Sequence, residues 1–408
     1  MTKRIFISVF ILILPCLSYA SSLPLFTQKY ERSAGKPNTY TASIDNCNTG
    51  ADYSIVVQNG EGGINRLSSS SITLNGVEVV RENEFNQRVE RVEKAITLQP
   101  ENTLNVRLAS GPGGFITVNI YCSANCLDIE ITNPVDAATI NTPGTIVRGL
   151  LHNVYGETGV TIDNGGVRAI SQVQGENFAG MVSLRVGANT ITAIATDACG
   201  YQAKDTIIVN TDSIEEPVRL SAMPSSGVLS TIGSLEVTFE AEANIPNPVA
   251  NYSWDFNGDG IVDESGSAIS EVTANYEQTG LYLPSVTVTD TLGSAYTETT
   301  VVNVLSRDEM DNLFKNKWEG MRGKLMGGDV EGAVRFFYER TRNRYREQFT
   351  ALAPVLNEIA SDMGEMRMVN ATADRAEYEI LIDRNGKRYS FHLIFVRDED
   401  GIWRIENF

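Results

Sequence analysis

Short runs of alternating apolar and polar residues fill the chain up to about residue 305, and glycine, asparagine and proline separate them. Examples are YSIVVQNG, SITLNGVEVV and ANTITAIATD. The last of these alternates cleanly, which is typical of a strand with one face turned toward a core. Short strands divided by turn residues at this spacing predict a series of β-sandwiches.

From about Ser306 the apolar residues follow helical spacing instead. One face of a first predicted helix comprises Met310, Leu313, Phe314, Trp318, Met321 and Leu325. Asp329 is expected to cap a second helix, which buries Val330, Val334, Phe337 and Tyr345. A third helix is expected to hold Leu352, Val355, Leu356 and Ile359. Three strand-like runs follow, with a hairpin signal at Arg384-Asn385-Gly386, so this part is predicted to be α+β.

The length and these patterns favour four domains after a leader. The predicted segments are a signal peptide at 1–20, a β-rich sandwich-like module at 21–125, β-sandwiches at 126–212 and 213–305, and an α+β domain at 306–408. The sequence SIEEP, residues 213–217, is interpreted as a linker. The fold class is therefore multidomain and mainly β.

The first twenty residues have the pattern of a secretory signal of the Sec type. Lys3 and Arg4 precede an apolar run at 5–14, and Ser18-Tyr19-Ala20 offers a cleavage site with small residues at its ends. The run is shorter than the roughly 20 residues that cross a bilayer. The mature chain is predicted to be periplasmic, on the cell surface or extracellular, without a transmembrane segment.

Export places the remaining four cysteines in an oxidising compartment, where an even number indicates disulfides. Three connectivities are possible. The pairing Cys47–Cys122 with Cys126–Cys199 is favoured, because the two separations nearly match and each bridge would close one domain. A Cys122–Cys126 bridge inside CSANC is the less economical alternative. Zinc is disfavoured, since no histidine lies near these cysteines and no C-x-x-C spacing occurs.

The acidic residues are concentrated in the β-rich part of the chain. The net charge is −18 over the whole sequence, −18 for residues 21–306 and −2 for residues 307–408. Such an acidic surface repels nucleic acid and favours cation binding, so no nucleic-acid partner is expected. Four arginines in ERTRNRYREQF, residues 339–349, would scatter around a helix. A working hypothesis is that Arg344 and Arg346 meet an acidic sandwich in a neighbouring domain.

The third segment contains NYSWDFNGDG, YEQTGLYLPSVTVTD and a following glycine, in this order. Over roughly 85 residues it resembles the polycystic-kidney-disease (PKD) domain, an immunoglobulin-like β-sandwich of secreted and surface proteins. Trp254 and Tyr276 are expected to be large core residues. Val286 and Val288 should point inward, and Asp290 should lie at a turn.

Two further segments resemble known modules. FAGMVSLRVGANTITAIATDACG in the second segment is similar to bacterial immunoglobulin-like modules. The phrases GDVEGAVRFF and DGIWRIENF in the last domain resemble the NTF2-like, or cystatin-like, cone fold. The fewer strands of this chain put a deep pocket of that fold in doubt.

The acidic stretch WDFNGDGIVDE has the oxygen spacing of a calcium loop. Asp255, Asn257, Asp259 and Asp263 stand at positions 1, 3, 5 and 9, and Ile261 at position 7 offers its carbonyl. Position 12 is a glycine, so the glutamate of an EF-hand is absent. A structural calcium ion is therefore one interpretation. The other is a hairpin whose Asn-Gly and Asp-Gly steps serve turn geometry.

Residues suited to catalysis are few. The chain has two histidines, His152 and His392, in different domains. His392 falls on a strand of the last domain, where an enzyme of NTF2-like fold would need a cavity and a carboxylate nearby. Serine-nucleophile and phosphate-loop motifs do not occur, so no catalytic residue is assigned.

These observations predict an exported, non-catalytic scaffold or adhesion-type protein that contacts protein or carbohydrate at a bacterial envelope. Two alternatives stay open. The last domain could bind a small molecule or be an enzyme, or the sandwiches could be a carbohydrate-binding accessory of a polysaccharide-degrading system. The second alternative requires exposed aromatic residues, whereas Trp254, Trp318 and Trp403 are all expected in cores.

Overall fold

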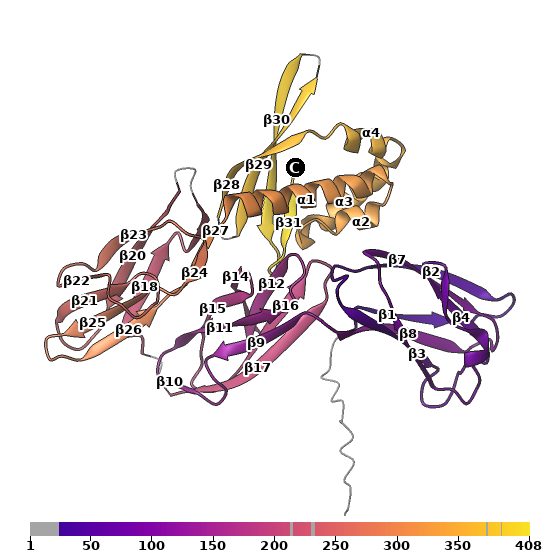
Figure 1. The fold of residues 1–408 in the computed structure, drawn as a ribbon, viewed down its shortest axis with the longest axis horizontal. Coiled ribbons are helices and arrows are strands. Elements are labelled where there is room, and N and C mark those ends of the chain that lie inside the picture. Colours follow the sequence, from indigo (N-terminus) through magenta and orange to yellow (C-terminus); the bar gives the residue numbers. More distant parts are fainter. Residues whose placement is uncertain (1–23, 213–214, 230–232, 373, 385) are drawn as a thin grey trace, which may run out of the picture.

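The computed structural model describes residues 24–212, 215–229, 233–372, 374–384 and 386–408 (Figure 1). The predicted signal peptide, residues 1–20, lies outside the described residues. We name four units by their ranges: unit 1 (24–125), unit 2 (126–212), unit 3 (215–305) and unit C (306–408). Sheets make up most of the described chain, and its α-helices all lie in unit C, so the mainly-β fold class is confirmed.

Unit 1 contains two four-stranded antiparallel sheets. One has the order β1 (Phe26–Glu31), β8 (Phe115–Ala124), β3 (Asp52–Asn59) and β6 (Arg91–Ile96). The other has the order β2 (Asn38–Asp45), β7 (Glu101–Leu108), β4 (Ser70–Leu74) and β5 (Val77–Val80), and a 3-10 turn η1 (Glu82–Glu84) follows β5. Alternation in β8 buries Ile116, Val118 and Ile120 completely, because every second side chain faces the core.

Unit 2 contains a five-stranded and a four-stranded sheet. The first has the order β10 (Thr139–Ile140), β17 (Gln202–Thr211), β16 (Gly187–Asp197), β12 (Thr158–Asn164) and β13 (Val167–Ile170). The second has the order β14 (Gln172–Gln174), β15 (Asn177–Ser183), β11 (Gly144–His152) and β9 (Asp128–Asn133). The run predicted as a half-buried strand is β16, which buries Ile191, Ala193 and Ala195.

Unit 3 contains three small sheets around its own core. Their orders are β18 (Val218–Met223), β20 (Leu235–Ala243), β23 (Glu271–Tyr276); β19 (Ser226–Val228), β27 (Val302–Leu305), β24 (Gly280–Tyr282); and β22 (Glu264–Gly266), β21 (Val249–Asp255), β25 (Ser285–Asp290), β26 (Ala295–Thr299). Trp254 and Tyr276 are core residues as predicted, and Val286 and Val288 are fully buried. The Asp290 carboxylate accepts hydrogen bonds from the main-chain N–H groups of Leu292 and Ser294, which confirms its place at a turn.

Unit C places helices on one face of an antiparallel sheet (Figure 1). The helices are α1 (Arg307–Met326), α2 (Val330–Val334), α3 (Glu339–Ala351), η2 (Ala353–Val355) and α4 (Leu356–Ser361). The sheet has the order β28 (Glu365–Ala371), β29 (Arg375–Arg384), β30 (Lys387–Arg397) and β31 (Trp403–Asn407). The predicted apolar face of α1 is buried against this sheet, apart from Leu313, which is partly exposed. The Asp329 side chain caps α2 by accepting a hydrogen bond from Gly332 N.

Two helix predictions for unit C were wrong. The second helix is in fact two, α2 and α3, because the chain between them pairs with β31: Ile405 N donates to Phe336 O, and Tyr338 N donates to Ile405 O. The third helix buries Leu356 but leaves Leu352, Val355 and Ile359 exposed. Pro354 cannot continue α3, which ends at Ala351, and the segment goes on as η2 and the short α4, so its apolar residues do not share one face toward the core.

The four units pack against one another and do not form an extended string. Units 1 and 2 share one continuous hydrophobic core, which runs from Tyr53 and Ile55 of unit 1 to Leu127, Ile129 and Tyr201 of unit 2. Unit C lies beside the junction of these two units, and unit 3 flanks it on the other side (Figure 1). Val228 of unit 3 packs against the core of unit C. Among the described residues, no helix has the length and apolar character needed to cross a membrane.

Candidate functional site

The acidic loop of unit 3 is built as a hydrogen-bonded turn. The Asp255 carboxylate accepts main-chain N–H groups from Asn257 at 3.2 Å, Gly258 at 2.7 Å and Gly260 at 2.8 Å. Gly258 and Gly260 both have positive φ, which glycine adopts without strain. Asp263 lies after the turn and accepts Phe256 N at 2.7 Å.

The remaining oxygens of the predicted calcium set are used in the same way. Asn257 Oδ1 accepts Asp259 N, and the two Asp259 oxygens accept Ile261 N and Asn257 Nδ2. These N–H groups hold the loop in its turn, and each of these oxygens accepts one hydrogen bond and keeps a second lone pair. In the ranges that the structure describes, no group of three or more His, Cys, Asp or Glu side chains is placed to hold a metal ion. The contacts support the turn interpretation, and calcium remains a prediction from the sequence pattern alone.

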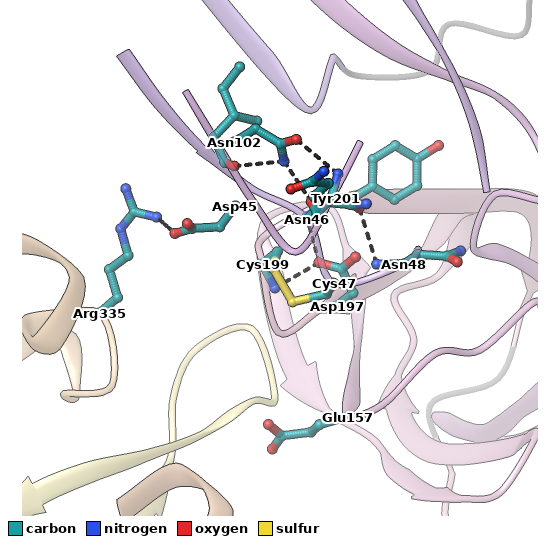
Figure 2. Close-up of a disulfide and its surroundings, with 12 residues drawn as sticks. Asp45, Asn46, Cys47, Asn48, Asn102, Glu157, Asp197, Cys199, Tyr201 and Arg335 are labelled. Atoms are coloured by element: carbon teal, nitrogen blue, oxygen red, sulfur yellow. Dashed lines mark hydrogen bonds and ion pairs between the residues drawn. A yellow bond between two sulfur atoms is a disulfide. The ribbon is translucent and has the colours of Figure 1, made fainter. Parts of the chain in front are cut away.

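The four cysteines form two disulfides, but not the favoured pairs. Cys47 is bonded to Cys199 (Figure 2). Cys122 is bonded to Cys126. The assumption that each bridge closes one domain was wrong. Units 1 and 2 meet end to end, so that the loop after β2 lies against the turn between β16 and β17, and the first bridge joins the two units. The second bridge closes the turn that leaves β8.

Buried polar groups surround the Cys47–Cys199 bridge. The Tyr53 hydroxyl donates to Asn46 Oδ1 at 2.7 Å, and burial together with the nearby Asp197 raises the pKa of Tyr53 to about 12. Asp197 accepts the main-chain N–H groups of Cys199 and Tyr201 at 2.9 Å each. Burial raises the pKa of Asp197 despite these bonds. Each unit therefore holds the loop that carries its own cysteine with internal hydrogen bonds, on both sides of the bridge.

Unit C docks on units 1 and 2 through basic side chains that meet acidic ones. Lys317 Nζ lies 2.5 Å from Glu157 Oε2, and both side chains are largely buried. Lys324 Nζ lies 2.6 Å from Glu101 Oε1 of β7. Arg335 pairs with Asp45 at the end of β2, close to the disulfide (Figure 2). All three cations belong to unit C and all three anions to units 1 and 2. Some of the acidic residues that are concentrated in the sandwiches therefore bind unit C.

The hypothesis that Arg344 and Arg346 meet an acidic sandwich was wrong, although other basic residues of unit C do pair with acidic residues of the sandwiches. Arg346 pairs with Glu331 of its own unit at 2.8 Å, and the Arg344 guanidinium lies over the Tyr345 ring. The cations that form ion pairs with the sandwiches come from α1 and the end of α2. The sequence analysis did not single out those residues, because an ion pair between distant segments has no local pattern.

The main chains of units 2 and C come into direct contact at two glycines. A Cβ atom at Gly159 of β12 would lie 2.4 Å from Asp400 O and 2.5 Å from the carbonyl carbon of Gly401. Gly401 has a φ of +82°. Beside this contact Glu157 Oε1 accepts Trp403 N at 2.8 Å. The turn between β30 and β31 therefore packs directly on β12, main chain against main chain.

Arg397 of unit C and Asn303 of unit 3 also form hydrogen bonds with unit 2. Arg397 Nη1 donates to Ser171 O at 3.1 Å, and its guanidinium lies over the Trp403 ring. Burial lowers the pKa of Arg397, although nearby Glu157 counteracts this effect. Asn303 of β27 in unit 3 donates to Gln172 Oε1 at 3.3 Å. Unit 2 thus contacts each of the three other units.

His392 lies on an exposed part of β30. The helix-facing side of the sheet is filled with aromatic rings: Phe314 contacts Tyr378, Phe395 and Trp403. Burial and the nearby Asp311 raise the pKa of the Tyr378 hydroxyl above its ordinary value. The other histidine, His152, lies 3.6 Å from Glu130 on the surface of unit 2.

The comparisons with known proteins agree with the resemblance in unit 3. Residues 220–303 match the PKD domain family. The chain therefore carries a PKD domain, and PKD domains and disulfides are both typical of extracellular proteins. No curated protein matches the sequence.

Several solved structures are similar to parts of this chain at low sequence identity. The fibronectin(III)-like modules of Clostridium thermocellum CbhA are 19% identical, cover 44% of this chain and 95% of their own, and have a TM-score of 0.19. Dimeric latent PorU from Porphyromonas gingivalis is 9% identical over 70% of this chain and 34% of its own, with a TM-score of 0.26. Tandem Ig repeats of Dlar are 12% identical over 45% of this chain and 100% of their own, with a TM-score of 0.21. TM-scores this low say nothing about the arrangement of the four units.

Proposed function

We propose that this protein is an exported, non-catalytic scaffold that holds unit C in a fixed position and presents it to a protein or carbohydrate partner at a bacterial envelope. The observation that carries the proposal is the position of unit 2, which contacts units 1, 3 and C. A PKD domain and two disulfides support a role outside the cytoplasm.

The interface with unit C has the chemistry of a permanent contact. It combines the buried Lys317–Glu157 pair with main-chain contact at Gly159. A buried pair of this kind is costly to break, since either partner alone leaves an uncompensated charge. A flexible string of modules would instead be expected to have small and polar contacts between neighbours.

The alternatives receive less support. A small-molecule site in unit C needs a cavity between the helices and the sheet, but Phe314 and Phe395 are packed there, and His392 is exposed on the other face of the sheet. A carbohydrate-binding accessory needs tryptophans at the surface, but Trp254, Trp318 and Trp403 are at most 3% exposed.

Small-angle X-ray scattering of the full chain tests the proposal. The wild type should have one compact shape whose radius of gyration does not change between low and high salt. Lys317→Glu should increase the radius, because it places a second anion beside Glu157. Arg346→Glu is the matched control, since it breaks a pair within unit C, and it should leave the radius unchanged. A wild type as extended as Lys317→Glu would contradict the proposal.

A further inference from the structure

A cavity of about 680 Å³ lies where units 2, 3 and C meet (Figure 1). Unit 2 supplies β14 and the loop before β12, and unit C supplies the first half of α1 and the turn between β30 and β31. Leu305, at the end of unit 3, completes the wall. Small-molecule sites have volumes of roughly 300–1,000 Å³, so this cavity has the size of a ligand site.

Arg397 is the one cation among the described residues that line this cavity. Its Nη1 donates to Ser171 O at 3.1 Å and to Gln172 Oε1 at 3.5 Å, and both of these acceptors are neutral. Its Nε is buried and has no acceptor in the described part of the chain. The guanidinium therefore keeps hydrogen-bonding capacity that its neighbours do not use.

The acidic side chains near Arg397 are engaged with other groups. Glu157 pairs with Lys317 at 2.5 Å, and the Asp374 carboxylate accepts the Thr372 hydroxyl at 3.4 Å. Burial lowers the pKa of Arg397, and the charges of Glu157 and Asp374 counteract this only in part. A desolvated cation without a direct counter-charge is costly, and a bound carboxylate supplies one through charge-assisted hydrogen bonds.

Apolar side chains form much of the remaining wall. Leu313 lines the cavity, which explains why it is the partly exposed member of the apolar face of α1. Val154 and Val173 of unit 2 also line the cavity and are partly exposed. The apolar part of a ligand would remove these three side chains from water.

Two exposed carboxylates at the cavity narrow the choice of anion. Glu176 and Glu309 both line it, and their charges repel a second negative group on a ligand. Phosphates and dicarboxylates are therefore disfavoured relative to a single carboxylate. A neutral sugar is disfavoured for another reason, because it leaves the charge of Arg397 uncompensated.

We propose that this cavity binds a small organic anion that has one carboxylate and an apolar body, of the kind found in medium-chain fatty acids. The carboxylate accepts hydrogen bonds from the Arg397 guanidinium, and the apolar body lies against Leu313, Val154 and Val173. Because three units form the walls, the bound ligand also strengthens the docking of unit C. The inference requires only that the units meet as described, and it does not depend on what unit C is presented to.

Isothermal titration calorimetry of the full chain tests the choice of ligand. Octanoate should bind at one site per chain and about tenfold or more tightly than acetate, which lacks the apolar body. Octylammonium has the same body and the opposite charge, and octanedioate has a second carboxylate. Both should bind about tenfold or more weakly than octanoate, since a hydrogen bond between charged groups is lost or opposed.

Two variants test the location of the site. Arg397→Gln keeps a donor toward Ser171 O and should weaken octanoate binding about tenfold or more. Leu313→Asn leaves the contacts of Arg397 in place and should weaken binding about fivefold, so the inference stays testable if Arg397→Gln loosens unit C. The matched controls are Arg388→Gln, in an exposed pair with Asp383, and Met326→Asn, at the exposed end of α1. Neither position lines the cavity, and both controls should bind octanoate as the wild type does.

Several results would overturn the inference. Absence of octanoate binding, or equal affinity for octanoate and octylammonium, would remove the carboxylate. Octanoate binding that neither Arg397→Gln nor Leu313→Asn weakens would place the ligand elsewhere on the chain. Binding of cellohexaose that Leu313→Asn removes, without binding of octanoate, would identify a sugar site instead. The scattering of the ligand-free chain is the same in all these cases, so failure here is distinct from failure of the scaffold proposal.

Discussion

Gly159 of unit 2 lies so close to Gly401 of unit C that no side-chain atom fits between them. A Cβ atom at Gly159 would lie 2.5 Å from the Gly401 carbonyl carbon, and the atoms it meets are main-chain atoms that cannot rotate away. This contact places the last turn of the chain on a central strand of unit 2.

The first prediction concerns this contact. Gly159→Ala should lower the free energy of unfolding by about 1–3 kcal/mol, the usual range for overpacking, because the two main chains must separate. Limited proteolysis should also release unit C faster. The control is Gly323→Ala in α1, where an added Cβ meets nothing within 4 Å and helix propensity favours alanine. Equal stability of Gly159→Ala and the wild type in urea titrations would contradict the contact.

The two disulfides should differ in their contributions. Cys47 and Cys199 are 152 residues apart and Cys122 and Cys126 are 4 apart. On the chain-entropy model the first bridge stabilises by about 5 kcal/mol and the second by about 2 kcal/mol. Replacing both cysteines of one pair by serine, and comparing melting temperatures, checks the order. Peptide mapping under non-reducing conditions should also find a fragment that links units 1 and 2; a Cys47–Cys122 fragment would contradict the structure.

The acidic loop of unit 3 should depend on Asp255 whether or not calcium is present. Asp255→Ala removes the acceptor of three main-chain N–H groups, so the melting temperature should fall equally in calcium and in chelator. On the turn interpretation, the wild type melts at the same temperature under both conditions. A calcium-dependent rise in the wild type that Asp259→Ala removes would instead show that the loop rearranges around an ion.

The pair Asp400–Arg404 should make stability depend on acid pH. Burial raises the pKa of Asp400, but the hydrogen bonds and charge of Arg404 outweigh this, so the pKa lies below its ordinary value. The stabilisation is therefore present above about pH 4 and decreases as the pH falls below it.

Arg404→Met tests this dependence. It leaves Asp398 and Asp400 without their common partner and should cost about 3–5 kcal/mol at pH 7. The difference from the wild type should shrink as the pH approaches 3, because protonation removes the buried charge. Arg388→Met breaks an exposed pair with Asp383 and should cause little change at either pH. A difference that stays constant from pH 7 to pH 3 would contradict the assignment.

The sequence pattern predicted correctly those structural features that depend only on neighbouring residues. The alternation in β16, the apolar face of α1 and the cap at Asp329 are all properties of neighbouring residues, and the structure contains each of them. The division of the second helix depends on pairing with β31, more than sixty residues later, and its own sequence gives no sign of this.

Among the site residues too, only features that do not depend on distant segments were predicted. The even number of cysteines predicted two disulfides, but their connectivity depends on how units 1 and 2 meet. Lys317 and Glu157 are separated by 160 residues, and only folding shows that they pair. The sequence gives no sign of this interface at Lys317, because the burial of its side chain appears only once unit C is docked.

The central position of unit 2 also limits how this architecture can evolve. Chains of independent sandwiches gain and lose repeats readily by recombination, because each junction is short and replaceable. Here, an extra repeat inserted between units 1 and 2 would carry Cys47 away from Cys199 and Asp45 away from Arg335. Homologues should therefore keep the number and order of these units fixed, and variation in length should fall at loop tips rather than at junctions.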